Sequence, residues 1–495
     1  MSGTTAPAVA PTGMTRIPLV TEHYPHASLP LSLKQLVNLF AEQAPTDARS
    51  PVALLSTPGL DIQYSVGTGP VHAMNGDLPG LIYVVSGARF YRMVFDSTPG
   101  APHVQDLGEI GSSGSFPAVT RFPTIAVGVS AVVVCVPPRA FTCSHDDTAV
   151  VELGGTFPGN ASSVAYLDGY FVFTSLTDLS QFFICGLLDP TNFDALDFAH
   201  ADASPNVITR AIAHRGDLWL MGQSAIEIWY DSGDLDFPFR RRPGGVIPHS
   251  CGGPTSPATG DGSVFWVGVD SIVYRSNGYK AERISTHGIE TQLRALGGGG
   301  TQALGLSYSQ NGHIFYAITA GQTTWVYDCA TKLWHTRSSP PSTPDGSTPW
   351  RIISASNVSD IPLLGDSLTG MLFYANLTHS VEVGNEQVHI ATLPPLYANT
   401  RRAFCARLEI EMETGDPPGS IGAIPVSTVK LQWSDDGGYS FSGGPRQISY
   451  GARAAYRTRA FTTRLGSFRQ RTFRLTTYGH TTYYAIDAEI TAGTS

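Results

Sequence analysis

The sequence predicts an all-β protein: a β-propeller of about seven blades, six being possible, followed by a C-terminal β-sandwich-like domain. The 495 residues are 42% apolar, enough for large buried cores, and they include 52 Gly and 35 Pro with only 14% charged residues. This composition suits many short strands joined by tight turns. Strand-like segments also recur at a near-constant interval in the middle of the chain, and longer strands follow them.

The recurring segments share one pattern: an apolar run, a break at Gly, Ser or Asp, and a second run rich in aromatic or β-branched residues. They lie between residues 80 and 375 and begin 44 to 50 residues apart, counting the last from Leu363. They start at Leu81, Ile125, Tyr170, Leu218, Val264, Ile314 and Pro362. An isolated meander cannot bury both faces, whereas a closed ring of meanders can, so this period is typical of propeller blades. The alternative, unrelated hairpins in a sandwich, would not be expected to keep so constant an interval.

Turn dipeptides introduce several of these units. They are DG at Asp168, GD at Gly216, DG at Asp261 and NG at Asn311. Such pairs readily supply the positive φ angles of tight hairpins, so each unit is predicted to be an antiparallel meander.

One helix is predicted, from Ser285 to Leu296. Its residues Ile289, Leu293 and Leu296 fall on one face, and the glycine run from Gly297 ends it. We expect it to be an excursion between blades.

The chain is expected to have three parts. Residues 1–50 form an N-terminal arm and an extended segment that joins the tail domain, residues 51–380 form the propeller, and residues 381–495 form the sandwich-like platform. The last division rests on the longer strands RRAFCARLEIEME, STVKLQWSD, RQRTFRLTTYG and TTYYAIDAEITAG, which no longer follow the repeat.

Charge and cysteine usage exclude several classes of protein. The formal net charge of −9 argues against electrostatic binding of DNA phosphates or anionic membranes by the chain as a whole. The first twenty residues lack a signal-peptide pattern, and no apolar run is long enough for a spanning helix, so no membrane insertion is expected. Six scattered cysteines favour buried free thiols over a disulfide framework. No cysteine or histidine spacing indicates a metal site, and no cofactor is expected.

Two groups of arginines are candidates for a docking surface. A basic window near the C-terminus contains no acidic residue, and the triplet RRR forms a second group. The candidates are Arg240, Arg241, Arg242, Arg453, Arg457, Arg459, Arg464, Arg469 and Arg471. The alternative is that these arginines are the solvated faces of exposed strands.

A short motif in the tail domain raises the possibility of an enzyme. Ser434, Asp436, Gly438, Ser440 and Phe441 spell Ser-x-Asp-x-Gly-x-Ser-aromatic, which resembles the Asp-box turn of sialidases and related propellers. Arg16 in TRIPLV resembles the carboxylate-binding arginine of the same family. Sialidases usually carry several Asp-boxes within the blades, whereas this one lies outside the repeats. The Asp-box is a structural turn, no pair of catalytic carboxylates can be assigned, and we predict no catalytic residues.

The order of several other segments resembles the tail-nozzle proteins of short-tailed bacteriophages, also called tail-hub or packaged-DNA-stabilisation proteins. The matching segments are QLVNLFAEQAP from Gln35, LLSTPGLDIQY from Leu54, AIAHRGDLWLMGQSAIEIWYDSGD from Ala211, GYKAERISTHGIE from Gly278, and LQWSDDGGYSF followed by RQRTFRLTTYG. Together they touch most of the chain from residue 35 onward.

This resemblance implies a structural virion protein without enzymatic activity. About six copies would form a ring, a homohexamer, below the portal and its adaptor in the virion tail, after assembly in the host cytoplasm. The ring would close the DNA channel, retain packaged DNA, guide its ejection and offer sites for tail fibres or spikes. Double-stranded DNA would pass without sequence readout, as a net acidic wall permits. The two groups of arginines would contact neighbouring subunits or the adaptor. The alternative function is a sialidase-like or glycan-binding propeller.

Overall fold

The computed structural model describes residues 13–26, 28, 32–44, 50–95, 102–111, 123–341, 346–358, 361–376, 381–398, 401–414, 428–449, 455–479 and 481–492. Strands make up nearly all the regular structure of these residues, and the helices are α1 (His287–Ala295) and the 3-10 helix η1 (Gly299–Gln302). The predicted all-β class is therefore confirmed. Within the described residues, no helix is long and apolar enough to cross a membrane.

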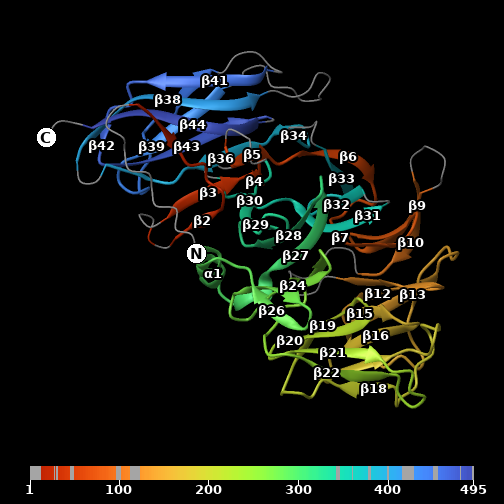
Figure 1. Cartoon of the computed structure of the whole chain (residues 1–495). Helices are drawn as coiled ribbons and strands as arrows, with labels where there is room; N and C mark the ends of the chain where they lie inside the picture. The colour runs from red at the N-terminus through yellow and green to blue at the C-terminus, as the bar shows by residue number, and fades with distance from the viewer. Residues whose placement is uncertain are drawn as a thin grey trace.

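Seven blades in the described part of the chain form a propeller (Figure 1): five are separate four-stranded sheets, and two are four-stranded parts of larger sheets. Blade 1 has β7 (Val71–Leu78), β8 (Leu81–Ser86), β9 (Arg89–Val94) and β10 (His103–Glu109), and blade 2 has β11 (Thr124–Val127), β12 (Ala131–Val136), β13 (Arg139–Ser144) and β14 (Val151–Glu152). Blade 3 has β15 (Ala161–Leu167), β16 (Tyr170–Ser175), β17 (Gln181–Ile184) and β18 (Phe198–His200), and blade 4 has β19 (Ile208–His214), β20 (Asp217–Gly222), β21 (Ile226–Asp231) and β22 (Phe239–Ile247).

The remaining blades follow in chain order except for one strand. Blade 5 has β23 (Ala258–Gly260), β24 (Ser263–Val267), β25 (Val273–Asn277) and β26 (Lys280–Arg283), and blade 6 has β27 (Leu304–Gln310), β28 (His313–Ala320), β29 (Thr323–Asp328) and β30 (Trp334–Arg337). Blade 7 has β31 (Ile352–Val358), β32 (Ile361–Asp366) and β33 (Met371–Asn376), and its fourth strand is the early strand β6 (Gly59–Ser65). The short strands β34 (Val381–Glu382) and β35 (Asn385–Glu386) extend this sheet.

Apolar side chains fill the space between each blade and the next. Between blades 3 and 4, for example, Val172 and Leu218 lie in one buried cluster, and between blades 7 and 1 Leu363 and Ile82 lie in another. An isolated meander leaves at least one apolar face exposed, whereas the ring buries both faces of each meander, and this burial stabilises the propeller. The ring closes where β31 contacts β7 and where β6 pairs antiparallel with β33, from Gly59 to Ser65.

The repeat predicted from sequence corresponds to these blades. Six of the seven segments begin at the second strand of a blade, whereas the segment at Ile125 begins one strand earlier, in β11. The predicted turns have positive φ at Asp168, Asp261 and Asn311 and at the glycine that follows each. At the fourth turn the positive-φ pair is Arg215-Gly216, with φ of 53° and 74°, so the turn lies one residue earlier than the predicted Gly-Asp pair.

The second domain is a sandwich built from strands at both ends of the described chain. One sheet contains β1 (Met14–Ile17), β4 (Leu39–Gln43), β5 (Val52–Ser56), β38 (Ala403–Thr414), β41 (Ala455–Thr463), β42 (Ser467–Phe468) and β44 (Thr481–Ala492). The other contains β2 (Tyr24–Pro25), β3 (Leu33–Val37), β36 (Val388–Thr392), β37 (Leu396–Tyr397), β39 (Thr428–Ser434), β40 (Arg446–Ser449) and β43 (Gln470–Tyr478). Side chains from both sheets, such as Leu408 and Leu475, share one core.

The two domains are joined by a continuous sheet. Strand β3 pairs with β30 of blade 6, so the second sandwich sheet extends that blade. Asn38, directly after β3, is fully buried with φ of 53°. Its Nδ2 donates to the carbonyls of Ser338 (2.9 Å) and Val388 (2.8 Å), and its Oδ1 accepts from Ser338 N (2.9 Å). This side chain therefore joins the end of blade 6 to both terminal parts of the sandwich.

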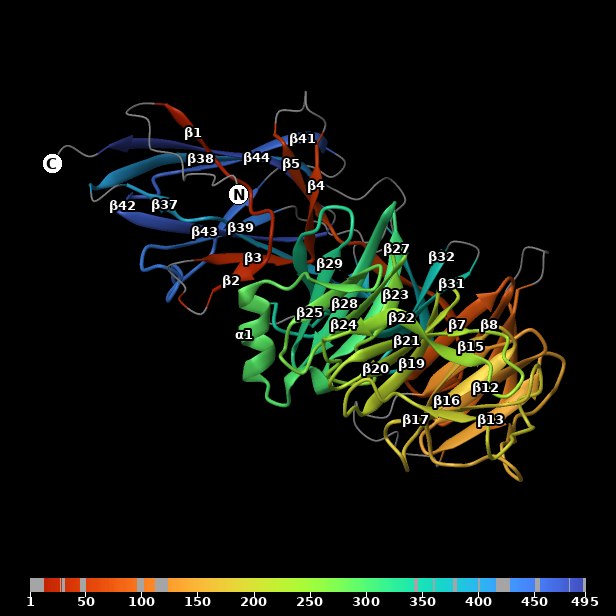
Figure 2. The same cartoon turned by 60° about the horizontal axis from the view of Figure 1, so that its bottom comes forward.

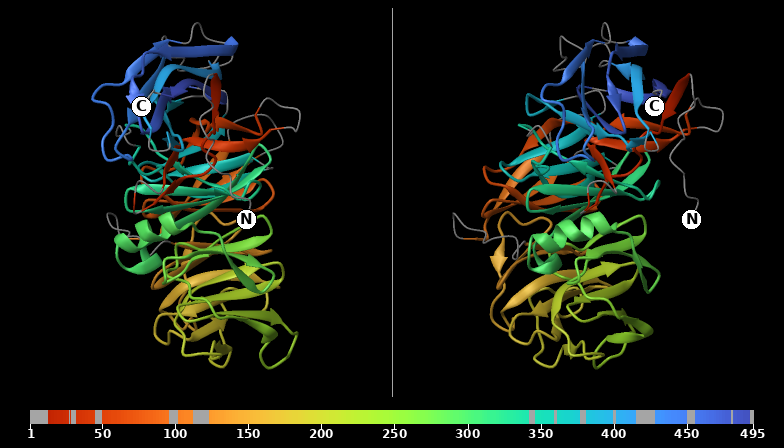
Figure 3. Two further views of the ribbon diagram at one scale, coloured as in Figure 1. Left: turned by 60° about the vertical axis from the view of Figure 1, so that its left-hand side comes forward. Right: turned by 90° about the vertical axis from the view of Figure 1, so that its left-hand side faces the viewer.

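Helix α1 braces the same junction from the side. It follows blade 5, begins after the N-cap Thr286, and buries Ile289 and Leu293 against blades 5 and 6, as predicted; Leu296, predicted to lie on that face, is the half-exposed C-cap. Figures 2 and 3 show the helix at the boundary between the propeller and the sandwich, where it contacts β2.

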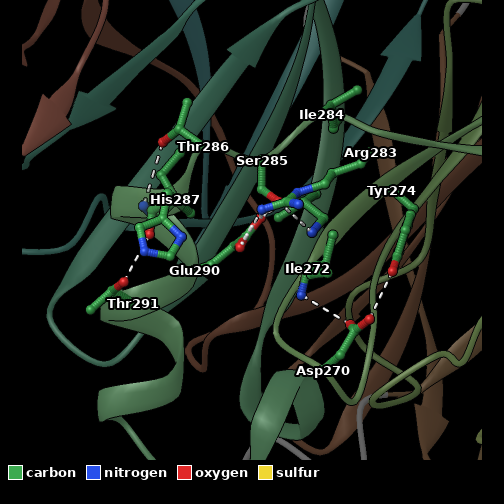
Figure 4. Close-up of polar contacts among 12 residues, drawn as sticks. Asp270, Ile272, Tyr274, Arg283, Ile284, Ser285, Thr286, His287, Glu290 and Thr291 are labelled. Atoms are coloured by element: carbon green, nitrogen blue, oxygen red, sulfur yellow. Dashed lines mark hydrogen bonds and ion pairs between the residues drawn. The ribbon is translucent and has the colours of Figure 1, made fainter. Parts of the chain in front are cut away.

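A buried carboxylate fixes α1 to its blade. Glu290 accepts two hydrogen bonds of 2.7 Å from Arg283, at the end of β26, and a third of 2.7 Å from the hydroxyl of Ser285 (Figure 4). Its side chain is almost fully buried. Because a buried charge needs such compensation, these bonds hold the helix in one orientation.

Candidate assembly surfaces and the Asp-box turn

The Asp-box motif forms a closed turn after β39. Asp436 accepts hydrogen bonds from the hydroxyl of Ser434 (2.7 Å) and from the backbone N and hydroxyl of Ser440, and Ser434 Oγ accepts from Gly438 N (2.8 Å). A Cβ at Gly438, which has φ of 98°, would lie 2.3 Å from Leu33 Cδ2. The turn therefore packs on β3, and its carboxylate is used to hold the loop.

The hydrogen bonds of this turn change the acidity of its carboxylate. They hold the pKa of Asp436 well below its usual range, the hydroxyl of Ser440 contributing most and its backbone N next. A depressed pKa in the folded state means that the ionised turn adds stability above the unfolded pKa of about 3.9, and that this stability is lost as the pH falls through the folded pKa.

Asp436→Asn is therefore expected to make the protein's stability less sensitive to acid. Between pH 5 and pH 3, taken as the range around the ordinary aspartate pKa of about 3.9, the urea midpoint of the wild type should fall more than that of the variant. Ser440→Ala, which removes the strongest donor, should lie between them. Equal losses in wild type and Asp436→Asn would show that the turn does not couple protonation to folding.

The residues that resemble sialidase motifs make contacts within the chain. Arg16 lies on β1 and pairs through Nε with Asp487 Oδ1 on β44 at 2.6 Å. Asp436 is occupied by its own turn. Both side chains thus serve structural contacts.

The triplet Arg240, Arg241 and Arg242 lies on β22, the outermost strand of blade 4, at the end of the molecule away from the sandwich (Figure 1). Arg240 pairs with Asp234, and Arg241 with Asp202 at 3.1 Å. The Nε of Arg242 donates to Asp217 at 2.8 Å, which raises the pKa of Arg242, and its guanidinium lies over the Tyr230 ring. All three are thus engaged within their own chain.

The C-terminal candidates fall into different environments. Arg471 is buried: its Nε and Nη2 bind Asp435 at 2.7 and 2.6 Å, and Nη1 donates to Leu465 O at 2.6 Å. Arg459 is exposed on β41, 3.6 Å from Glu409. Arg464 and Arg469 are exposed, and neither has an ion pair with a described residue. Arg453 lies outside the described residues, as does the side chain of Arg457.

Two further arginines, not singled out from sequence, lie next to Arg464 and Arg469. The exposed pair Arg401 and Arg402 directly precedes β38, whose first residue, Ala403, is opposite Phe468. Ala398 N donates to Arg469 O, which brings the loop before β38 against the same segment. The two adjacent arginines at the start of RRAFCARLEIEME are the feature of the sequence that could have indicated them. We call Arg401, Arg402, Arg464 and Arg469 the basic edge.

Aromatic side chains flank the basic edge. Tyr397 and Phe404 are 40% and 48% exposed, which leaves large apolar surfaces near guanidinium groups that have no ion pair with a described residue. Aromatic and arginine side chains are enriched in the parts of protein interfaces that carry most of the binding energy. The basic edge is therefore the strongest candidate assembly surface among the described residues.

Two family models match consecutive parts of the chain. The model for the β-propeller of bacteriophage P22 Gp10 matches residues 15–380, and the model for its β-sandwich matches residues 389–493. The chain belongs to the bacteriophage P22 Gp10 family. As a member of this tail-nozzle and DNA-stabilisation family, it is a structural component of the virion tail and assembles with other virion proteins. The predicted propeller and sandwich are confirmed.

Other comparisons give weaker likenesses. No curated protein matches this Gp10-family chain in sequence. Among solved structures, the computationally designed Ika8 protein is 13% identical, covers 69% of this chain and 99% of its own, and has a TM-score of 0.37. YCF48 bound to D1 peptide is 11% identical over 65% of this chain and 98% of its own, with a TM-score of 0.39. U3-55K is 8% identical, covers 64% of this chain and 100% of its own, and has a TM-score of 0.41.

Proposed function

We propose that about six copies of the chain form the nozzle ring below the portal adaptor, retain packaged DNA by closing the channel, guide its ejection, and carry fibres or spikes. The family match over both domains is the observation that supports this role most directly. The role is structural, and the conduit wall requires no catalytic residue.

The size of the propeller's own cavity favours a channel formed between subunits. Its central cavity measures about 400 Å³, and a cylinder only as wide as the major groove of B-DNA, about 12 Å, would fill that volume within one base-pair step of about 3.4 Å. DNA therefore does not fit through one propeller. A ring of subunits would enclose a wider path, and the net charge of −9 would disfavour tight binding to the phosphates along it.

The basic edge is proposed as the surface that contacts a neighbouring subunit or the adaptor. Arg464 and Arg469 have exposed charges with no described acidic partner, whereas Arg471 is excluded because it is buried in the sandwich. Arg240 to Arg242 remain a second candidate surface on blade 4. A closed ring needs complementary patches on the two sides of each subunit, so removal of one patch should stop ring closure.

The double variant Arg464→Glu, Arg469→Glu is expected to abolish the ring, or adaptor binding, while leaving the monomer folded. Native mass spectrometry of the protein with and without purified adaptor, alongside circular dichroism, measures both. Arg240→Glu is the control, because it reverses one exposed arginine, half the charge change of the double variant, far from the sandwich. Loss of assembly only in Arg240→Glu would place the interface on blade 4, and a wild-type chain that stays monomeric even with adaptor would contradict the proposed ring.

A further inference from the structure

The central cavity of the propeller contains one partly buried arginine, Arg210, which has no ion pair with a described residue. The cavity of about 400 Å³ is lined by residues of the inner strands of six blades, among them Arg210 on β19. Arg210 is the only lysine or arginine among the described lining residues, and Asp77, exposed at the rim, is the only carboxylate. Asp77 is itself engaged by the Nδ2 of Asn75 at 2.8 Å.

Only part of the Arg210 guanidinium is satisfied by the protein. Nη1 donates to Pro254 O at 3.1 Å and to Pro257 O at 3.4 Å, both on the segment that leads into β23. Nε and Nη2 have no acceptor among the described residues. Arg210 thus connects blades 4 and 5 through Nη1, and its Nε and Nη2 can donate to another acceptor.

Arg210 forms no ion pair with a carboxylate of the described residues. The buried thiol of Cys251 interacts electrostatically with Arg210, but burial raises the pKa of that thiol, so it stays neutral. His72, which also lines the cavity, has its pKa lowered to about 4 by burial and is neutral at pH 7. Because Arg remains protonated in proteins, Arg210 places a positive charge inside the cavity, while Asp77, the one carboxylate among the described lining residues, lies exposed at the rim. A charge that is only partly exposed to water is stabilised by an anion that its free N–H groups can reach.

Neutral hydroxyl groups complete a polar lining. Ser307 on β27 and Ser356 on β31 line the same cavity, and no hydrogen bond to another described side chain or carbonyl is recorded for either hydroxyl. Ser354 and Thr255, by contrast, donate to Val71 O and Ala303 O. Sites that bind small polar ligands usually combine a concave pocket with a few hydrogen-bond donors that point into it.

We propose that the central cavity of the propeller binds a small oxyanion, a carboxylate or phosphate group, through Nε and Nη2 of Arg210. A planar guanidinium presents two parallel N–H donors that match two oxygens of either group. The cavity volume admits such a group with water but excludes a nucleic acid duplex. This site is independent of the nozzle role, because it belongs to one subunit.

Isothermal titration calorimetry with inorganic phosphate and with citrate, each at matched ionic strength against chloride, tests the proposal. The wild type is expected to bind at least one of them saturably, with one site per chain, and to melt at a higher temperature in its presence. Preference for phosphate or for citrate would identify which oxyanion the cavity takes. Absence of saturable binding by both would overturn the proposal and leave Arg210 as a brace between blades.

Variants separate the site from the fold. Arg210→Gln keeps an amide donor for Pro254 O and is expected to weaken binding at least tenfold. Arg215→Gln, at the exposed turn after the same strand, is the matched control and should bind as the wild type does. If Arg210→Gln does not fold, Arg210→Lys retains the charge but loses the two parallel donors, and it should bind several-fold more weakly. Unchanged binding in the folded Arg210 variant would contradict the proposal.

Discussion

Asn38→Ala is expected to lower the free energy of unfolding by about 4 kcal/mol. The change leaves Ser338 N, Ser338 O and Val388 O without their side-chain partner in a fully buried site. Each buried polar group left unsatisfied costs about 1–3 kcal/mol. Alanine also tolerates a φ of 53° less well than asparagine, which adds about 1 kcal/mol.

Asn160→Ala is the matched control for the cost of placing alanine at a positive φ. Asn160 has a φ of 49°, but it is exposed and its side chain donates only to Thr177 Oγ1. It is expected to cost about 1 kcal/mol. Urea unfolding followed by tryptophan fluorescence measures both variants, and a loss for Asn38→Ala no greater than that for Asn160→Ala would show that the buried hydrogen bonds do not stabilise the junction.

Arg471→Met is expected to destabilise the sandwich by about 3 kcal/mol. Arg471 is 2% exposed, and methionine fills part of its volume while removing the two bonds to Asp435 and the bond to Leu465 O. Asp435 is 43% exposed and can be rehydrated, so the unpaired carbonyl oxygens and the lost bidentate pair account for most of the cost.

Arg469→Met provides a control of the same chemistry two residues away. Arg469 is exposed and has no ion pair with a described residue, so its replacement should change the free energy of unfolding by less than about 0.5 kcal/mol. The fluorescence of Trp433, whose ring centre lies 5.6 Å from the guanidinium carbon of Arg471, is a local probe of the sandwich. Similar midpoints for the two variants would contradict an internal role for Arg471.

The sequence predicted the features that depend on local pattern. The interval between Leu81 and the later segments predicted the blades, because each blade must bury the same kind of strand in the same position. The DG and NG pairs predicted positive-φ turns, since few other residues adopt them cheaply. The helix was predicted for the same reason: Ile289 and Leu293 repeat with helical spacing.

Other features depend on contacts between distant residues, which the letters do not reveal. Nothing in LLSTPGLDIQY indicates that β6 completes the last blade, because this pairing is set by closure of the ring. Arg471 and Arg469 look alike in sequence, and only the packing of Phe468 and Asp435 separates a buried side chain from an exposed one. Asn38 and Arg210 each interrupt an apolar run, LVNLF and ITRAIA, but neither was singled out from sequence, because the letters do not show which interruptions are buried.

The place of β6 in blade 7 has a consequence for synthesis. Ser65 pairs with Met371, and Arg16 near the start of the described chain pairs with Asp487 near its end. Early strands of the nascent polypeptide therefore remain unpaired and exposed to solvent until their partner strands emerge last from the ribosome. A chain that terminates before Met371 can complete neither the propeller nor the sandwich. Incomplete translation products are therefore expected to be degraded rather than incorporated into particles.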